Sequence, residues 1–287
     1  MKVIIFPNIL KKDAYSCTVK VCEILSGLGA ELLMDNIYRT EFCSITQIKF
    51  GSFGALVHVA DIAIAIGGDG TILKCAAKMI GCSTKLLGIN TGRLGFMASV
   101  EKDNLQALSR IFTNEYKISE RMLLTAEYTV NNEKMMYHAL NDVVISGAYT
   151  KIIDFDVYVN DNLIGNYRAD GVVFSTPTGS TAYSLSAGGP IIEPELECIE
   201  MNLICPHSLF ARPMIYTDDK ILSFVHNSPD DSNICFSVDG NDAVPLKKGD
   251  RLVIRKSGHK INLIDMSGVT FYDALNKKLT RSLKGNI

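Results

Sequence analysis

This 287-residue chain lacks the strong charge and the long apolar segments that mark several large classes of protein. Its formal net charge is −2 at pH 7 and it has no long basic block, so we expect no nucleic-acid partner. It has no uninterrupted apolar run of membrane-spanning length, so we expect no membrane partner. Residues 1–7 lack the apolar region and cleavage site of a secretory signal. These absences predict a cytoplasmic protein.

The cysteines and histidines show no metal-binding or disulfide pattern. The eight cysteines include no Cys-x-x-Cys pair and no metal-finger spacing, and the five histidines are scattered. We therefore predict reduced thiols, mostly buried, because free cysteine is among the most buried residue types. The cysteines are Cys17, Cys22, Cys43, Cys75, Cys82, Cys198, Cys205 and Cys235.

The first third of the chain alternates between strand-like and helix-like patterns. Residues 3–6 and 60–66 are short apolar runs, typical of strands buried on both faces of a parallel sheet. Residues 13–28 and 71–79 carry apolar side chains at helical spacing. Strands that alternate with helices predict an open, doubly wound, Rossmann-like α/β domain, which we place at residues 1–117.

After about residue 117 the apolar pattern changes to a period of two, with turns rich in Asn, Asp and Gly. This pattern predicts a mainly β domain at residues 118–267, built as layered sheets or a sandwich. Helical spacing returns at residues 273–283, within a tail that we place at 268–287. The expected strands are residues 123–130, 153–159, 171–175, 220–226 and 251–255.

A glycine-rich turn, Gly-Gly-Asp-Gly at residues 67–70, lies between an apolar strand and a helix. Such a turn places backbone N–H groups and the positive end of the helix dipole at a sheet edge, where anions bind. It lacks the Gly-x-Gly-x-x-Gly of dinucleotide folds and the Gly-Lys-Ser/Thr of a P-loop, so it supports neither of those sites. The candidate phosphate- or ATP-binding residues are Gly67, Gly68, Gly70, Thr71 and Lys74.

Asp69 is the carboxylate inside this turn, although a carboxylate repels phosphate. Its presence is explained if the site also holds a hydroxyl group. In phosphoryl transfer a carboxylate accepts the proton of the attacking hydroxyl, or orients that hydroxyl, while other groups neutralise the phosphate. The alternative is a capping aspartate in a tight turn, since Asp and Gly are favoured turn residues.

A second segment, residues 168–190, is dense in hydroxyl groups and glycines. Its apolar residues 172–174 predict a buried strand. The Thr-Gly-Ser-Thr that follows at 178–181 offers hydroxyl and amide donors suited to a sugar phosphate, and Tyr183 is placed to lie against a base or ribose. Loops of this kind commonly carry function, although a merely structural turn is the alternative.

Several motifs of the chain, taken together, resemble those of NAD kinases, in the family's order from about residue 60 to 245. The Gly-Gly-Asp-Gly turn is shared with lipid kinases and phosphofructokinases, whereas the run Ser-Thr-Pro-Thr-Gly-Ser-Thr-Ala-Tyr-Ser is highly specific. The motifs are residues 67–70, 88–90, 92–96, 140–142, 175–190, 205–209 and 212–213.

The resemblance implies an ATP-dependent kinase that phosphorylates the 2′-hydroxyl on the adenosine ribose of NAD, giving NADP and ADP. It implies an N-terminal α/β domain, a C-terminal β domain and a C-terminal helix that returns to the first. The active site is then expected between the domains and between subunits of a homodimer or homotetramer. Mg²⁺ or another divalent cation is expected with ATP, because transfer of a γ-phosphoryl group needs charge neutralisation. No protein metal ligand and no prosthetic group are expected.

The resemblance also assigns roles to residues. Asp69 matches the proposed proton acceptor, and Asn141 and Asp142 match the pair that holds the ribose and adenine of NAD. Gly70 and Lys74 match contacts to nucleotide or phosphate. The candidate NAD-binding residues are Asp69, Gly70, Lys74, Phe96, Asn141, Asp142, Lys151, Arg168, Asp170, Thr181, Ala182, Tyr183, Ser184, Leu185, Ser186 and Asn241.

The chain departs from the family pattern at three places. Asp142 stands where many members have Glu, which shortens the carboxylate by one methylene. Asn241 stands where Gln is common. The segment after Asp142 is one residue shorter than in many members, which weakens the match of Lys151 to an NAD contact of the family.

Two other functions remain open from the sequence. A lipid or sugar kinase would share the Gly-Gly-Asp-Gly turn but would leave the hydroxyl-rich run unexplained. A nucleotide-sensing module would bind NAD or NADP without chemistry, but it has no need for a carboxylate beside a phosphate site.

Overall fold

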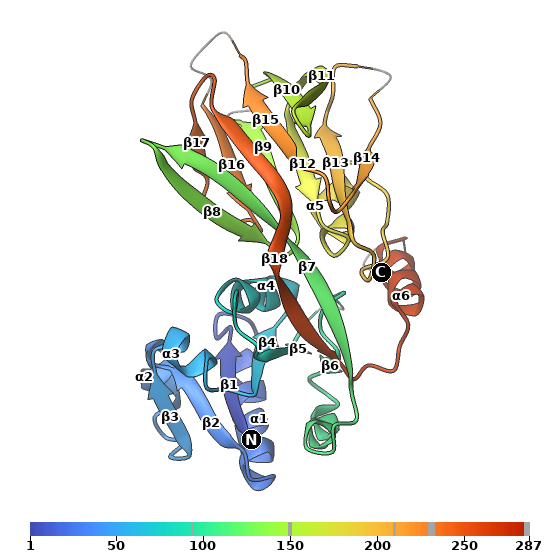
Figure 1. Ribbon diagram of the computed structural model, residues 1–287. Helices are drawn as coiled ribbons and strands as arrows, with labels where there is room; N and C mark the ends of the chain where they lie inside the picture. The colour runs from blue at the N-terminus through green and yellow to red at the C-terminus, as the bar shows by residue number, and fades with distance from the viewer. Residues whose placement is uncertain (93–94, 149–150, 209–210, 229–232, 284–287) are drawn as a thin grey trace. The chain divides into compact units, whose positions relative to one another are not determined.

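The structure is a computed structural model, and it describes residues 1–92, 95–148, 151–208, 211–228 and 233–283 (Figure 1). The chain forms two compact units. Unit 1 comprises Met1–Glu120 and Ile261–Ile287, and unit 2 comprises Arg121–Lys260.

A parallel sheet forms the centre of unit 1. Its strands are β1 (Lys2–Pro7), β2 (Glu31–Asp35), β3 (Ile48–Gly51), β4 (Ile62–Gly67), β5 (Lys85–Asn90) and β6 (Val100–Glu101). The order is β3-β2-β1-β4-β5, with β6 beside β5, and all these neighbours are parallel (Figure 1). β4 is buried at every position, as expected for a strand that is covered on both faces.

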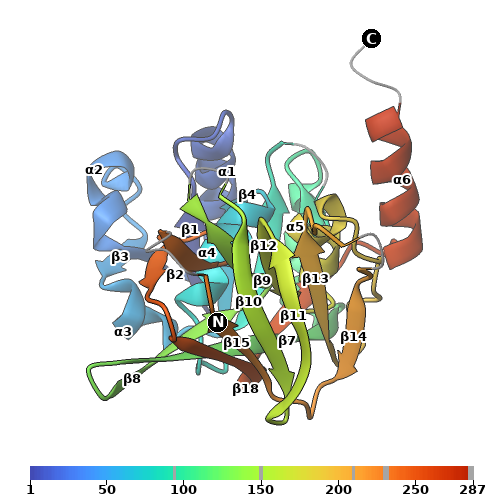
Figure 2. The same cartoon turned by 90° about the horizontal axis from the view of Figure 1, so that it is seen from above.

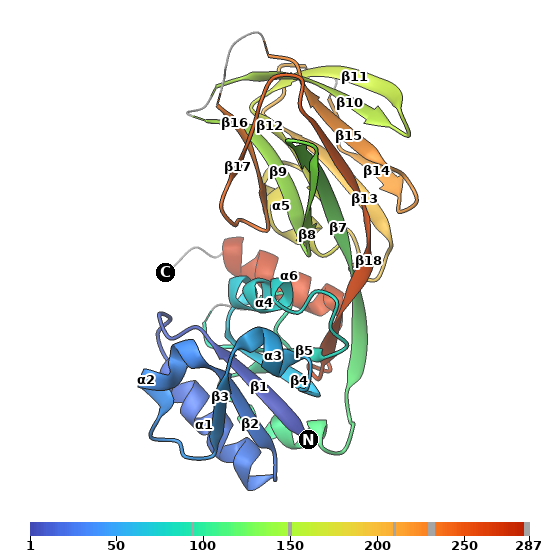
Figure 3. The same cartoon turned by 60° about the vertical axis from the view of Figure 1, so that its left-hand side comes forward.

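Helical segments cover both faces of this sheet. They are α1 (Ala14–Gly27), η1 (Asn36–Tyr38), α2 (Arg39–Phe42), α3 (Phe53–Val57), α4 (Asp69–Ala77) and η2 (Leu105–Ile111). A further helix, α6 (Phe271–Leu283), also belongs to unit 1. Val21 of α1 and Leu108 of η2 pack with Ile5 of β1 in one apolar core. On the other face, Phe6 packs edge-on against Phe53 of α3 at 5.4 Å between ring centres. Figure 3 shows α3 beside the strands of this sheet. The sheet is therefore doubly wound.

Unit 2 consists mainly of antiparallel strands. They are β7 (Lys117–Val130), β8 (Glu133–Ala139), β9 (Asp142–Gly147), β10 (Ile153–Val159), β11 (Asn162–Ala169), β12 (Gly171–Ser175), β13 (Cys198–Ile204), β14 (Met214–Thr217), β15 (Leu222–His226), β16 (Ile234–Val238), β17 (Val244–Leu246) and β18 (Arg251–Asp265). The short turns η4 (Gly179–Thr181) and α5 (Tyr183–Ser186) follow β12. One sheet has the order β14-β13-β12-β9-β16-β17, and its neighbours β12, β13 and β14 are clear in Figure 2.

The other strands of unit 2 form the run β11-β10-β15-β18 and the hairpin β7–β8. Both groups of strands contribute to one apolar core, which contains the buried rings of Phe155, Phe174, Phe224 and Phe236. This is the layered β arrangement that the period-two pattern predicts. Two hairpin turns also lie where the sequence predicts turns, because Asn131, Asn132, Asn160 and Asp161 all have positive φ, between 47° and 67°.

The strand expected at residues 251–255 is longer than predicted. β18 continues to Asp265, and Leu263 pairs in parallel with Leu86 of β5. Polar residues at 256–260 hide this continuation from the sequence pattern, because they interrupt the apolar alternation. Buried Ile261 and Leu263 resume it.

The thiols are all free, but fewer are buried than the sequence suggested. Cys17, Cys22, Cys75 and Cys198 are buried, whereas Cys43 and Cys205 are exposed. Burial raises the pKa of Cys22 to about 12, so that thiol is not reactive at neutral pH.

Candidate functional site

The Gly-Gly-Asp-Gly turn lies at the carboxyl ends of the strands of unit 1. β1 has β2 on one side and β4 on the other, so the order of the strands reverses at this point. Ligands of open α/β sheets bind at such a switch point, beyond the carboxyl ends of the strands. β4 ends at Gly67 and α4 begins at Asp69, which puts the turn and the helix N-terminus at this position.

Tight packing explains Gly67, the first glycine of the turn, and Thr71 in the helix that follows. A Cβ at Gly67 would overlap the side chain of Thr71. The Thr71 hydroxyl oxygen accepts from the Gly68 N–H at 3.4 Å and from Nδ2 of Asn8 at 3.2 Å, and Thr71 is 2% exposed. Thr71 therefore supports the turn from within, and its expected contact with phosphate stays a prediction.

The Asp69 carboxylate is held by a loop that is distant in the sequence. Its Oδ2 accepts from the Phe96 N–H at 2.9 Å and its Oδ1 from the Met97 N–H at 3.3 Å. A Cβ at Gly95 would overlap this carboxylate, so the loop approaches as closely as it does because residue 95 is glycine. Asp69 is half-buried. Its two donors come from the loop after β5, so the carboxylate is positioned by tertiary structure rather than used to cap its own helix.

Lysine residues lie at the turn, in the helix after it and at the loop that contacts it. Nζ of Lys11, in the loop after β1, lies 2.7 Å from the place that a Cβ of Gly68 would take. Lys74 is exposed one turn into α4. Nζ of Lys278 on α6 lies 3.8 Å from the centre of the Phe96 ring. Asn8, Lys11 and Lys278 are not among the site residues predicted from the sequence. Asn8 and Lys11 could have been predicted from their position directly after the first strand, because the loops that follow parallel strands meet at one edge of the sheet.

In unit 2, a half-buried carboxylate orders the Asn141–Asp142 segment. Asp239 accepts from the backbone N–H groups of Leu140, Asn141 and Asp142 at 2.8, 2.7 and 3.1 Å. Burial raises the pKa of Asp239, and these three hydrogen bonds oppose the rise. Asp239 was not predicted as a site residue, because its hydrogen-bond partners lie 97 to 99 positions earlier in the chain.

Asn141 and Asp142 are both buried at the start of β9. Burial, followed by the nearby charges of Asp239 and Glu200, raises the pKa of Asp142 to about 7. The side-chain oxygen of Asn141 has no hydrogen-bond partner among the residues that the structure describes. A buried acceptor without a partner is costly, so this end of the sheet is suited to a ligand that brings a donor.

The hydroxyl-rich run after β12 uses many of its hydroxyl groups internally. The Thr176 hydroxyl donates to the Leu140 carbonyl at 2.6 Å, and the Ser180 hydroxyl donates to the Pro177 carbonyl at 2.7 Å. The Ser184 hydroxyl donates to Glu200 at 2.6 Å and is buried. Tyr183 is 45% exposed. The run thus forms a rigid support that presents some side chains, and the expected NAD contact of Ser184 stays a prediction. Thr181, Ala182 and Leu185 are half-buried, and Ser186 and Asn241 are exposed.

The remaining predicted residues lie near the ends of β9 and β12 that are opposite Asp142. Ser175 pairs with Asp142, whereas Gly171 pairs with Ser146, so β12 runs about 13 Å from one end to the other at ~3.3 Å per residue. Asp170 directly precedes Gly171, and Arg168, which faces Asp154 at 3.9 Å, precedes it on β11. Lys151, which is exposed, follows the far end of β9. Within one chain, these three residues are not brought together with Asn141 and Asp142.

Two other features of the described residues bear on function. No group of three or more His, Cys, Asp or Glu side chains gathers as it would around a metal ion. No helix among them is long and apolar enough to cross a membrane.

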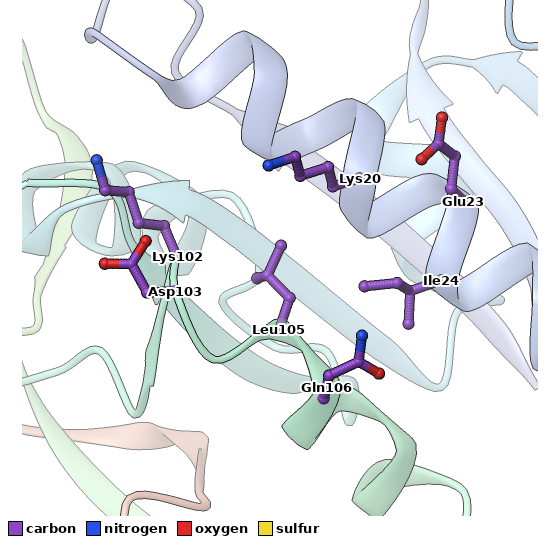
Figure 4. Close-up of a pocket in the computed structure, with 7 residues that line it drawn as sticks. All are labelled: Lys20, Glu23, Ile24, Lys102, Asp103, Leu105 and Gln106. Carbon is purple, nitrogen blue, oxygen red and sulfur yellow. The ribbon is translucent and has the colours of Figure 1, made fainter.

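A small pocket lies between α1 and η2 (Figure 4), and none of the predicted site residues lines it. Its lining residues are Lys20, Glu23, Ile24, Lys102, Asp103, Leu105 and Gln106.

Comparison with known families gives two matches that cover most of the chain. Residues 3–116 match the ATP-NAD kinase N-terminal domain, and residues 140–266 match the ATP-NAD kinase C-terminal domain. The NAD kinase of Caldanaerobacter subterraneus subsp. tengcongensis is 37% identical over 283 residues, which cover 97% of this chain and 99% of that protein. The NAD kinase of Acetivibrio thermocellus is 38% identical over 289 residues, which cover 97% of each.

Solved structures share the fold. Yeast NADH kinase complexed with NADH has a TM-score of 0.88 and 23% identity, with 100% of this chain and 88% of that chain covered. An NAD kinase from Archaeoglobus fulgidus in complex with ATP has a TM-score of 0.76 and 23% identity, with 98% and 99% covered. The predicted fold class, an α/β domain with a mainly β domain and a C-terminal helix, is confirmed.

Proposed function

The chain belongs to the ATP-NAD kinase family, and from this premise we propose that it transfers the γ-phosphoryl group of ATP to the 2′-hydroxyl of the adenosine ribose of NAD. The products are NADP and ADP. Relatives that are NAD kinases and span nearly the whole chain support this reaction. The family, together with the hydroxyl-rich run in unit 2, disfavours a lipid or sugar kinase.

The single observation that carries the chemistry is the position of the Asp69 carboxylate. Two backbone N–H groups hold it beside the N-terminus of α4, at the switch point of the sheet. A general base must be fixed within hydrogen-bond reach of the proton that it removes. In the proposal Asp69 accepts the proton of the 2′-hydroxyl as the hydroxyl oxygen attacks the γ-phosphorus, and the bond from that phosphorus to the leaving ADP breaks. A sensing module would have no use for such a fixed carboxylate.

Phosphate binding is assigned to the groups around this carboxylate. The backbone N–H groups at the start of α4, together with the ammonium groups of Lys11 and Lys74, supply positive charge at the turn. Mg²⁺ enters with ATP as part of the nucleotide complex, where it neutralises the phosphates. Gly67, Gly68 and Gly70 allow the backbone to approach the phosphates closely.

Recognition of NAD is assigned to unit 2. Asn141 and Asp142, ordered by Asp239, are proposed to hold the adenosine ribose and adenine, and Tyr183 to lie against a ring of the dinucleotide. With a pKa of about 7, Asp142 both donates and accepts hydrogen bonds near neutral pH, which suits a ribose hydroxyl.

A second copy of the chain is proposed to complete the NAD site. Lys151, Arg168 and Asp170 resemble NAD contacts of the family, yet they lie at the far end of the sheet from Asp142. A homodimer or homotetramer in which one copy supplies the Asp142 end and its neighbour supplies the Asp170 end accounts for both sets. The cytoplasmic location expected from the sequence stays a prediction.

The test is a turnover assay with purified protein. Mg-ATP and NAD are mixed with the protein, and NADP is detected with a dehydrogenase that responds only to NADP. Parallel reactions replace NAD by NADH, and ATP by inorganic polyphosphate. The proposal expects NADP from ATP and NAD. Binding of NAD without NADP from any donor would instead indicate a sensing module, and phosphorylation of a diacylglycerol or sugar phosphate would indicate another kinase.

A further inference from the structure

Lys278 on α6 meets the loop that holds the Asp69 carboxylate. Its Nζ lies 3.8 Å from the centre of the Phe96 ring, and the N–H of that same residue donates to Asp69. The ring of Phe271, at the start of α6, lies 6.2 Å from the Phe96 ring. The tail helix therefore contacts the loop that positions the carboxylate, more than 180 residues earlier in the chain.

The environment of Lys278 differs from that of a solvated surface lysine. Burial lowers the pKa of Lys278, and the negative charge of Asp69 opposes this shift. The ring face of Phe96 also attracts the cation. The neighbouring Lys277, on the same helix, is exposed. The two adjacent lysines are thus in different settings, and only Lys278 is directed towards the loop of Asp69.

More positive charge gathers at this turn than one carboxylate needs. Lys11 approaches the turn at Gly68, Lys74 lies one helical turn onward, and Lys278 lies at Phe96. Lys11 at the turn and Lys278 at the loop that holds the carboxylate, together with a helix N-terminus, favour a ligand with several negative charges, and a nucleotide triphosphate has that character.

We propose that Lys278 binds the terminal phosphates of the nucleotide donor and stabilises the charge on the transferring phosphoryl group. The assignment of the reaction rests on the proposed function. As the 2′-oxygen bonds to the γ-phosphorus and the hydroxyl proton passes to Asp69, the bond to the ADP oxygen breaks and its electron pair leaves with ADP. Lys278 stays protonated throughout and contributes charge. The tail helix is then part of the active site of unit 1 and not only a structural extension.

The experiment compares Lys278→Met and Lys278→Arg with Lys277→Met as the matched control on the same helix. Calorimetry gives the Kd for Mg-ATP without NAD, the coupled assay gives kcat and the KM for NAD, and thermal unfolding gives Tm. For Lys278→Met we expect a Kd for Mg-ATP raised about 10-fold, as for loss of one charge-assisted contact. We expect kcat to fall about 10²-fold, as for loss of one donor to a transition state. The KM for NAD should change little, and Lys278→Arg should recover part of both losses.

Two results would overturn the inference. One is a Lys278→Met protein with the Mg-ATP affinity and kcat of Lys277→Met. The other is a loss that Lys278→Arg does not relieve and that comes with a fall in Tm, because this combination indicates a purely structural role. The binding measurement separates this inference from the proposed function. If the unaltered protein makes no NADP but needs Lys278 to bind Mg-ATP, the reaction is wrong and the phosphate contact stands.

Discussion

The carboxylates of the two units stand in opposite surroundings. Asp69 in unit 1 is half-buried, receives two backbone N–H groups from the loop after β5, and has the ammonium groups of Lys11 and Lys278 nearby. Asp142 in unit 2 is buried, and the charges that act on its pKa, those of Asp239 and Glu200, are both negative. This difference fits the two roles that we propose, in which Asp69 takes up a proton beside phosphate and Asp142 makes hydrogen bonds to NAD.

A methyl group added at Gly95, in the loop that holds Asp69, should lower kcat and leave the KM for NAD nearly unchanged. A Cβ at Gly95 would overlap the carboxylate, so Gly95→Ala must displace either the loop or the base. We expect kcat to fall about 10²-fold, because a shift of about 1 Å at a reacting group has effects of that size. The KM for NAD should change little. Steady-state kinetics measures both quantities.

The control is Gly92→Ala in the same loop, where an added Cβ meets nothing within 4 Å. It should keep the unaltered kcat. Equal losses in the two variants would show that the loop is merely sensitive to substitution, and would break the contrast between the units.

Removal of the Tyr183 side chain in unit 2 should raise the KM for NAD and leave kcat nearly unchanged. Tyr183 is 45% exposed on the turn after β12, where it is proposed to lie against NAD. Tyr183→Ala should raise the KM for NAD about 10-fold, the scale of one lost aromatic contact, with kcat little changed. The same kinetic assay measures it, with Leu196→Ala as an exposed apolar control in unit 2. A fall in kcat with an unchanged KM would place Tyr183 in the chemistry instead.

The smallest expected effect concerns stability and pH. The pKa of Asp142 is raised to about 7 from its ordinary value of 3.8, so folding favours the protonated form. The contribution of this group to stability is therefore greatest below about pH 4 and is lost as pH rises to about 7. Asp142→Asn removes the charge and keeps a similar shape. Its Tm relative to the unaltered protein should rise by a few degrees between pH 5 and pH 8.

Thermal unfolding across this pH range tests that sign. Asp242→Asn, which changes an exposed carboxylate in the same unit, serves as the control and should show no such trend. A Tm difference for Asp142→Asn that is the same at pH 5 and pH 8 would show that burial does not disfavour the charged form of Asp142.

The sequence was sufficient to predict those strands, turns and helices whose formation depends on residues close together in the chain. The apolar run before Gly67 and the glycines around Asp69 predict a strand, a turn and a helix, and the structure has β4 ending at Gly67 and α4 beginning at Asp69. The Asn131-Asn132 and Asn160-Asp161 turns were predictable for the same reason, since Asn and Asp tolerate positive φ. The sequence placed domain limits at 117 and 267, and the compact units divide at 120 and 260.

The parts that the sequence did not predict depend on contacts between distant segments. The donors to Asp69 come from Phe96 and Met97, and Lys278 reaches the same loop from the tail. No local pattern encodes such pairs, because the same residue types are common on surfaces. Ser184 was selected by its residue type, and its hydroxyl donates to buried Glu200, so its contact with NAD stays a prediction.

The central claim is that Asp69 removes the proton of the acceptor hydroxyl, and one measurement tests it most directly. Asp69→Asn keeps the size of the side chain and removes its basicity. NADP formation is followed in a single turnover at saturating Mg-ATP and NAD, and calorimetry gives the Kd for NAD. The account predicts a rate at least ~10²-fold lower, the low end for losing a general base, with NAD binding retained. A rate close to that of the unaltered protein would contradict it, and Asp69 would then be a residue of the turn alone.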